Sequence, residues 1–443
     1  MNTTFHRPTQ KLIKTSDSDT LNKCAHVVKY ICNITRIKGW CVMKWIIEES
    51  TAIQDELLTH RHWLHRHAEV GFALDETRRY VRQELERMGI ETEDCGKSGL
   101  TAVLGKGDSG KTILLRADMD ALPIPEESGV DFACVNGNMH ACGHDMHTAM
   151  LLGAAKLLKK HESELNGTVK LMFQPAEEIF EGARDMLENG VLSDPKPDAA
   201  IMIHVTAASP MPSGMVIICP PGVSAPAADY FTVTVQGKGC HGSAPHNGID
   251  AISAASHILL GLQEIHAREL PSSEDAVLTI GTFQGGTAPN VIADKAVLAG
   301  TIRTYSEGSR NFLKERMQTI SESIAAAYRA SATVEFGSGC PTLVNDKALG
   351  KLLHKCLKEA LDANMVLNAA DLGTSMRGGG SEDFAYISHE VPSVMLALAA
   401  GRPDQGYIYP QHHPKVTFDE SVLYVGTAVL VSSVFGFFEQ DTR

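Results

Sequence analysis

Residues 139–151 read MHACGHDMHTAML, and this stretch concentrates side chains that bind metals or act as nucleophiles. Cys142 and His144 are two positions apart, close enough for both to reach one ion from a loop, and a thiolate with imidazoles suits zinc and similar divalent metals. A nucleophilic cysteine is the alternative, but it needs a base and an orienting third group. The many ligand-type side chains nearby favour a metal, and we expect His140 and His147 to be hydrogen-bonded structural residues.

Acidic residues follow two apolar runs. The segment RADMD (116–120), which ends with Asp120, comes directly after ILL, and FQPAEE (173–178) ends with Glu177 and Glu178. Both segments are expected at the carboxyl ends of strands, where open α/β sheets bind ligands. One of the two adjacent glutamates can bind a metal while the other takes a proton from water. Taken alone, these acids would indicate a solvated turn or an ordinary helix N-terminus.

Two further ligand-type segments contain histidines. MIHV (202–205) places His204 at the end of another apolar run, and YPQHHPKV (409–416) has His412 and His413 in a loop before a proline. Each segment is weak evidence by itself. Several ligand-type clusters at strand ends or loops of one α/β domain together predict a metal centre.

The segments between these clusters indicate the elements that position them. A helical pattern covers residues 45–66, an apolar helix is predicted over 148–160, and apolar strands alternate with helices up to about residue 220. This alternation predicts an α/β sheet covered on both faces. Residues 223–338 have the order strand, helix, strand, strand, helix, strand, which predicts an inserted α+β sandwich. We therefore expect a discontinuous main domain, 44–222 plus 339–443.

Composition excludes several classes of protein. The chain has 443 residues and a net charge of −13, which argues against broad nucleic-acid binding. The chain has no long uninterrupted apolar stretch, so no membrane span is expected. The ten cysteines form no CxxC pair in a long chain, so a reducing cytoplasm is expected. Residues 1–42 carry seven Lys/Arg and two acids, and we expect them to be a non-globular leader.

Ten motifs of this chain occur in an order and spacing that resemble the M20 peptidase family, and more narrowly its branch of hippurate hydrolases and N-acyl-amino-acid amidohydrolases. The resemblance runs from about residue 46 to the end. The motifs are LHRHAEVGF (64–72), RADMDALP, HACGHDMHTAM, FQPAEE, IHV, GCHGSAPH (239–246), GGTAPNVI (285–292), GTIRT (300–304), GSEDFAY (380–386) and HHPKV. A set of this size is far more specific than any single motif.

The resemblance implies a catalytic domain with two divalent metal ions and an inserted lid or dimerisation domain. It implies that Glu177 is the general base and that Asp120 supports the base or orients a ligand. The ligand positions of the family match Cys142, His144, Glu178, His204 and His412.

The resemblance also implies roles for three residues of the inserted domain. His241 matches a histidine that stabilises the oxyanion, often in a neighbouring subunit's site. Asn290 and Arg303 match positions that hold the substrate carboxylate, and an arginine fork pairs well with a carboxylate. The alternatives are a turn residue for His241 and a surface charge for Arg303. A homodimer or higher homo-oligomer is expected through this domain.

Two departures from the family pattern stand out. Cys240 replaces the more usual glycine before His241, and RGGGSEDF (377–384) is unusually rich in glycine. The second change predicts a wider or more mobile acyl or side-chain pocket.

The expected activity is metal-dependent hydrolysis of the amide bond of N-acyl amino acids, hippurate-like or N-acetyl, to a carboxylic acid and a free amino acid. Alternatives are a dipeptidase or exopeptidase, a cysteine hydrolase using Cys142, and a binding protein that has lost catalysis. Retention of Glu177 and of all five ligand candidates argues against the last. The sequence leaves the metal open among Mn, Zn, Ni and Co.

Overall fold

The computed structural model describes residues 44–105, 110–372 and 380–439. The predicted leader, residues 1–42, lies outside the described residues. So do residues 377–379 of the glycine-rich segment.

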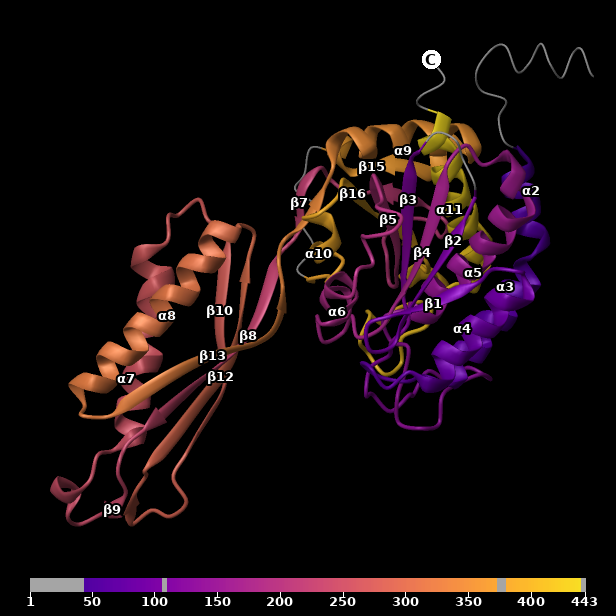
Figure 1. The fold of residues 1–443 in the computed structure, drawn as a ribbon. Helices are drawn as coiled ribbons and strands as arrows, with labels where there is room; N and C mark the ends of the chain where they lie inside the picture. Colours follow the sequence, from indigo (N-terminus) through magenta and orange to yellow (C-terminus); the bar gives the residue numbers. More distant parts are fainter. Residues whose placement is uncertain (1–43, 106–109, 373–379, 440–443) are drawn as a thin grey trace, which may run out of the picture. The chain divides into compact units, whose positions relative to one another are not determined.

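A mixed eight-stranded sheet forms the centre of the main α/β part (Figure 1). Strands β4, β3, β5 and β16 run parallel to one another, and β1 and β2 pair antiparallel to their neighbours. Strand β6 pairs antiparallel to β16 and parallel to β15. In spatial order the strands are β1 (Thr92–Cys95), β2 (Gly99–Leu104), β4 (Thr168–Gln174), β3 (Thr112–Asp118), β5 (Ala199–Thr206), β16 (Ser393–Ala399), β6 (Val216–Ile218) and β15 (Val366–Asn368). The parallel centre brings the carboxyl ends of β3, β4 and β5 to one edge.

Helices cover both faces of this sheet, which explains why its central strands are mostly apolar and almost entirely buried. On one side α5 (His144–Lys160) packs against β3, α3 (Gln54–Arg66) and α11 (Leu423–Phe438), and α9 (Lys347–Ala360) packs against α11. On the other side apolar residues of α6 (Gly182–Glu188) and α10 (Ala385–Ser388) pack in one cluster with residues of β3, β4 and β5. The remaining helices of this part are α2 (Lys44–Ala52) and α4 (Asp75–Arg87).

Two sequence-based boundaries differ from the structure. The pattern over residues 45–66 forms two helices, α2 and α3, that are interrupted at Ile53. The helix predicted over 148–160 begins four residues earlier, at His144, so this histidine lies on a helix and not in a loop.

The segment 420–438, which includes α11, is apolar and long enough to cross a membrane, but 83% of its apolar window is buried inside the fold. It contacts α3, α5 and α9. The segment is therefore a buried helix of the core, which explains its apolar composition.

Residues 227–340 form a second, four-stranded antiparallel sheet with two long helices. Its strands are, in spatial order, β10 (Ala276–Gly285), β12 (Lys295–Thr304), β8 (Ala227–Gln236) and β13 (Ser331–Cys340). Alternate residues of β8, such as Phe231, Val233 and Val235, are buried against α7 (Ala251–Glu264) and α8 (Glu307–Ala327). The short strands β9 (Cys240–His241) and β11 (Val291–Ile292) pair with each other, as do β7 (Gly222–Ala225) and β14 (Leu343–Asn345). The predicted fold class, an α/β domain with an inserted α+β unit, is confirmed; the exact domain limits stay a prediction.

Candidate metal centre

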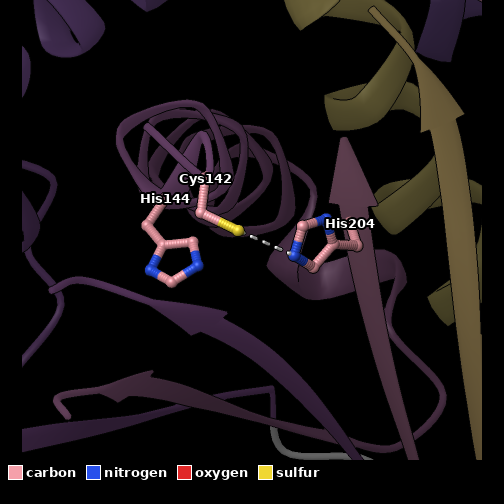
Figure 2. Close-up of side chains that lie close together, drawn as sticks. All are labelled: Cys142, His144 and His204. Atoms are coloured by element: carbon pink, nitrogen blue, oxygen red, sulfur yellow. Dashed lines mark hydrogen bonds between the residues drawn. The ribbon is translucent and has the colours of Figure 1, made fainter. Parts of the chain in front are cut away.

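The turn before α5 brings Cys142 and His144 toward His204 at the end of β5 (Figure 2). The Cys142 Sγ atom lies 3.6 Å from His204 Nε2. Gly143 between the two ligand candidates has φ +90°, and a Cβ atom there would lie 2.4 Å from Val205 Cγ2. Only glycine fits this turn without strain.

Backbone carbonyls orient both histidine rings. His144 donates from Nδ1 to the carbonyl oxygen of Asp120 at 2.8 Å, and His204 donates from Nδ1 to the carbonyl oxygen of Val205 at 2.7 Å. Each ring is thereby left with Nε2 as its ligand atom, which is the usual arrangement of metal-binding histidines. His144 Nε2 is buried and has no hydrogen-bond partner.

The two glutamates face the same point. The carboxylate of Asp120 accepts hydrogen bonds from the backbone N–H groups of Glu177 (3.0 Å) and Glu178 (3.2 Å). Each glutamate carboxylate lies 3.9 Å from His144 Nε2. Ala176, the preceding residue, has φ +54°, an unusual value for a residue with a side chain. Asp120 therefore holds the segment that carries both glutamates, which agrees with the supporting role predicted for it.

His412 completes the cluster from a distant part of the chain. It also has a positive φ, +65°, and its backbone N–H donates to the carbonyl oxygen of Ala141. Its Nε2 atom lies 3.4 Å from Glu178 Oε1. The structure thus brings all five predicted ligands together: Cys142, His144, Glu178, His204 and His412. Gln411, which the sequence did not single out, donates from Nε2 to the carbonyl oxygens of Cys142 and Val205.

The donor set fits a divalent metal. Two of its atoms, His144 Nε2 and Glu178 Oε1, are buried without hydrogen-bond partners. Burial and Glu178 work to raise the pKa of Cys142, but His204 and His144 outweigh them, so that its pKa falls to about 6. Contacts with Cys142 and Glu178 raise the pKa of His412 to about 10. The two pKa shifts favour a thiolate at Cys142 beside a protonated His412, and a metal ion takes the place of such a proton.

Glu177 differs electrostatically from its neighbour. Burial and the nearby carboxylates of Glu382 and Glu178 raise the pKa of Glu177 well above its usual range. Burial opposes ionisation of Glu178 as well, but its contact with His412 and the charge of His144 lower its pKa. One carboxylate is thus suited to accept a proton and the other to bind a cation.

The remaining polar residues of the opening stretch differ from Cys142 and His144 in their partners. His147 donates from Nδ1 to Asp118 at 2.5 Å and accepts at Nε2 from the N–H group of Val205, so neither nitrogen is free. Asp145 pairs with Arg61 and His65. The expected hydrogen bonds of His140 are absent among the described residues, where both of its buried nitrogens lack a partner.

Sequence reasoning missed the group around Arg116. Its fully buried guanidinium contacts Asp118 (2.8 Å), Glu382 (2.8 Å) and Asp383 (3.1 Å). Glu382 and Asp383 lie in a motif that was recognised without a role being assigned. An arginine inside the apolar strand TILLRAD is the signal that could have found this group, because a buried charge requires partners.

In the inserted unit Arg303 lies apart from the other two predicted residues, His241 and Asn290. His241 and Asn290 are neighbours, because β9 pairs with β11 and the N–H of Gly242 donates to the carbonyl oxygen of Asn290. Arg303 lies near the other end of β12. From Lys295 to Arg303 the strand spans about 26 Å at about 3.3 Å per residue. One small substrate therefore cannot touch both groups of the same chain.

Comparisons with known proteins agree with this geometry. A family model described as "Peptidase family M20/M25/M40" matches residues 114–435. The N-acetyl-L-cysteine deacetylase of Bacillus subtilis is 37% identical over 387 residues, 87% of each chain. Thermostable carboxypeptidase 2 of Saccharolobus solfataricus is 37% identical over 384 residues, 84% of this chain and 93% of the relative. The crystal structure of Bacillus subtilis YXEP protein, described as a dinuclear metal binding peptidase from the M20 family, is 34% identical, covers 88% of this chain and 99% of that one, and superposes with a TM-score of 0.70.

Proposed function

We propose that this chain, which belongs to peptidase family M20/M25/M40, hydrolyses the amide bond of N-acyl amino acids. The family resemblance of the motifs is thereby confirmed, and the chain is a metal-dependent amidohydrolase in the general sense. The acyl amino acid substrate is our proposal. The observation that carries it is the buried base candidate Glu177, whose carboxylate lies 3.9 Å from the unpartnered Nε2 atom of His144.

Two divalent ions would be held by Cys142, His144, Glu178, His204 and His412, and Mn, Zn, Ni and Co all suit a mixed S, N and O donor set. Bound there, such ions supply polarisation of the scissile carbonyl and a lower pKa of the attacking water.

The chain itself moves the proton. Glu177 takes a proton from the attacking water and returns it to the leaving amine, since its raised pKa makes it a stronger base than an exposed carboxylate. Asp120 keeps Glu177 and Glu178 in register by holding their N–H groups. The products are a carboxylic acid and a free amino acid.

Residues of the inserted unit complete the proposed site. Arg303 lines a pocket of about 540 Å³, and its Nη1 atom donates to the carbonyl oxygen of Ile302. We propose that the guanidinium fork binds a substrate carboxylate in this pocket. His241 and Asn290 lie at the other end of this unit. We propose that they act in the site of a second copy in a homodimer, with His241 stabilising the oxyanion and Asn290 the substrate carboxylate.

A panel of substrates tests this proposal. Hippurate, N-acetyl amino acids and free dipeptides are assayed with the metal-free protein and after restoring each candidate metal. We expect metal-dependent release of free amino acid from at least one N-acyl amino acid. Metal-restored protein that hydrolyses no acylated substrate would overturn it.

Glu177→Gln is the matching variant. It removes the base but keeps the side-chain shape, so we expect unchanged metal content and a loss of turnover of about 100-fold or more. Glu181→Gln, on the same segment but outside the donor cluster, is the control and should retain turnover. Near-normal turnover of Glu177→Gln would rule out the assigned base.

A peptidase acting on unblocked peptides is the second candidate, because one relative is a carboxypeptidase. Higher kcat/KM on dipeptides than on N-acyl amino acids would favour it. A cysteine hydrolase predicts inactivation by thiol alkylation together with resistance to chelators. We also propose a cytoplasmic location, since the described cysteines are all free thiols and Cys142 must stay reduced to bind metal.

A further inference from the structure

The buried carboxylate of Asp383 ties three separate segments together. Its Oδ1 atom accepts hydrogen bonds from Gln174 Nε2 at 2.6 Å and from Arg116 Nη2 at 3.1 Å. Its Oδ2 atom accepts from the backbone N–H of Ala183 at 2.9 Å. The side chain of Asp383 has no exposed surface. Three donors from the protein therefore hold both oxygens.

Two of these donors lie at the two ends of the segment that carries Glu177. Gln174 is the last residue of β4, and Ala183 is the second residue of α6. The path between them is tight, because a Cβ atom at Gly182 would lie 1.5 Å from the carbonyl oxygen of Pro175. The segment 174–183 is thus a loop whose ends meet at Asp383.

The third donor, Arg116, anchors this loop to the centre of the sheet. Arg116 lies on β3 and has no exposed side-chain surface. Its Nε atom donates to Gln174 Oε1 at 2.8 Å, and its Nη2 atom donates to Glu382 Oε1 at 2.8 Å. Arg116 therefore contacts Asp383 directly. It also binds Gln174, which donates to Asp383, and Glu382, which precedes Asp383 in the chain.

We infer that Asp383 is a positioning residue for Glu177: it closes the loop 174–183 against Arg116 and so fixes where the base stands. The inference rests on the proposed function only for the role of Glu177. Asp120 holds the middle of this loop by the N–H groups of Glu177 and Glu178, and Asp383 holds its two ends.

Asp383→Asn tests the clamp because the amide has the same shape but one oxygen fewer. Whichever way the amide turns, its NH₂ group faces a donor, either the N–H of Ala183 or the Gln174 and Arg116 side chains. We expect kcat to fall between about tenfold and about 100-fold while KM changes less than about threefold, because the base is displaced and the substrate contacts are not. Metal content should fall less than kcat, since Cys142, His144, His204 and His412 lie outside this loop and Asp120 still holds the N–H group of Glu178.

Hydrogen exchange gives a readout that needs no substrate. In Asp383→Asn the backbone amides of residues 176–183 should exchange faster than in the wild type. Unchanged exchange there together with unchanged kcat would overturn the inference. Faster exchange in a protein that hydrolyses no acyl amino acid would keep the clamp and reject the proposed function, so the two failures are distinguishable.

A reciprocal exchange supplies the rescue. Gln174→Glu alone places a second carboxylate against Asp383 and should also lower kcat. In the double variant Gln174→Glu/Asp383→Asn, the Asn amide donates to Glu, and its oxygen accepts from Ala183. We expect kcat of the double variant to exceed that of both single variants. If Asp383→Asn alone folds poorly, the comparison with Gln174→Glu still tests the clamp. A double variant at or below Gln174→Glu in kcat would contradict the clamp.

Asp229→Asn is the control for loss of a buried, arginine-paired carboxylate. Asp229 is 3% exposed and accepts from both Arg310 and Lys314, but it lies on β8 of the inserted unit. This variant should lower the Tm without accelerating exchange in residues 176–183. Equal acceleration in both variants would show a general loss of stability and overturn the inference.

Discussion

Ring nitrogens decide which histidines of the opening stretch can bind a metal. His144 and His204 each donate a hydrogen bond from Nδ1 to a backbone carbonyl, which leaves Nε2 facing Cys142 and the glutamates. In His147 both nitrogens are hydrogen-bonded, Nδ1 to Asp118 and Nε2 to the N–H group of Val205. Residues of one type in one motif thus differ in function only through their hydrogen bonds.

His65 gives a prediction at this scale. Burial works to lower its pKa, but hydrogen bonds to Asp145 and Glu126 outweigh that effect and raise the pKa to about 9. A folded pKa above the unfolded value of about 6.5 stabilises the fold fully below pH 6.5, and this contribution is lost as the pH rises through 9. The shift corresponds to up to about 3 kcal/mol.

The measurement compares the wild type with His65→Gln by urea unfolding between pH 6 and pH 10. The wild type should exceed the variant in unfolding free energy at pH 6, and the difference should shrink toward pH 10. A difference that is constant with pH would show that His65 is neutral in the fold.

At the scale of elements, the start of α5 places two ligand candidates around a single glycine. Gly143→Ala would force a Cβ atom into a left-handed turn and to within 2.4 Å of Val205 Cγ2. We expect reduced metal content and a loss of about 2 kcal/mol or more of stability, since strain and steric overlap add. Metal analysis and thermal unfolding measure the two effects.

Gly129→Ala is the matched control. Gly129 has φ +79°, but nothing lies within 4 Å of the position of its Cβ atom. This variant carries the backbone strain alone, so it should lose about 1 kcal/mol and keep its metal. Equal metal loss in both variants would contradict a special role for the Gly143 turn.

At the scale of the whole molecule, the separation of His241 from Arg303 predicts a site shared between two copies. Glu177→Gln and His241→Ala should each be inactive as homodimers. A purified heterodimer of the two contains one site with both Glu177 and His241, and should recover about half of the wild-type activity. Tandem affinity tags and an activity assay make this measurement. A heterodimer that stays inactive would show that His241 acts within its own chain.

The sequence alone determined the α/β class with its insertion, the family, the five ligand candidates and Glu177. The α/β class with its insertion follows from local pattern, because apolar periodicity and strand-end polar residues are properties of short segments. The family, the five ligand candidates and Glu177 follow from the resemblance of the ordered motifs to the M20 peptidases. It also left roles open in motifs that it recognised, notably Glu382 and Asp383.

Only the tertiary structure decided how these parts act on one another. It brought His412 to Cys142 across the chain, gave His147 its hydrogen-bond partners Asp118 and Val205, and placed Arg116 among Asp118, Glu382 and Asp383. It also placed Arg303 at the far end of a strand from His241 and Asn290. The physical reason is that hydrogen bonds, burial and pKa values depend on distances between segments remote in sequence, and no local pattern encodes those distances.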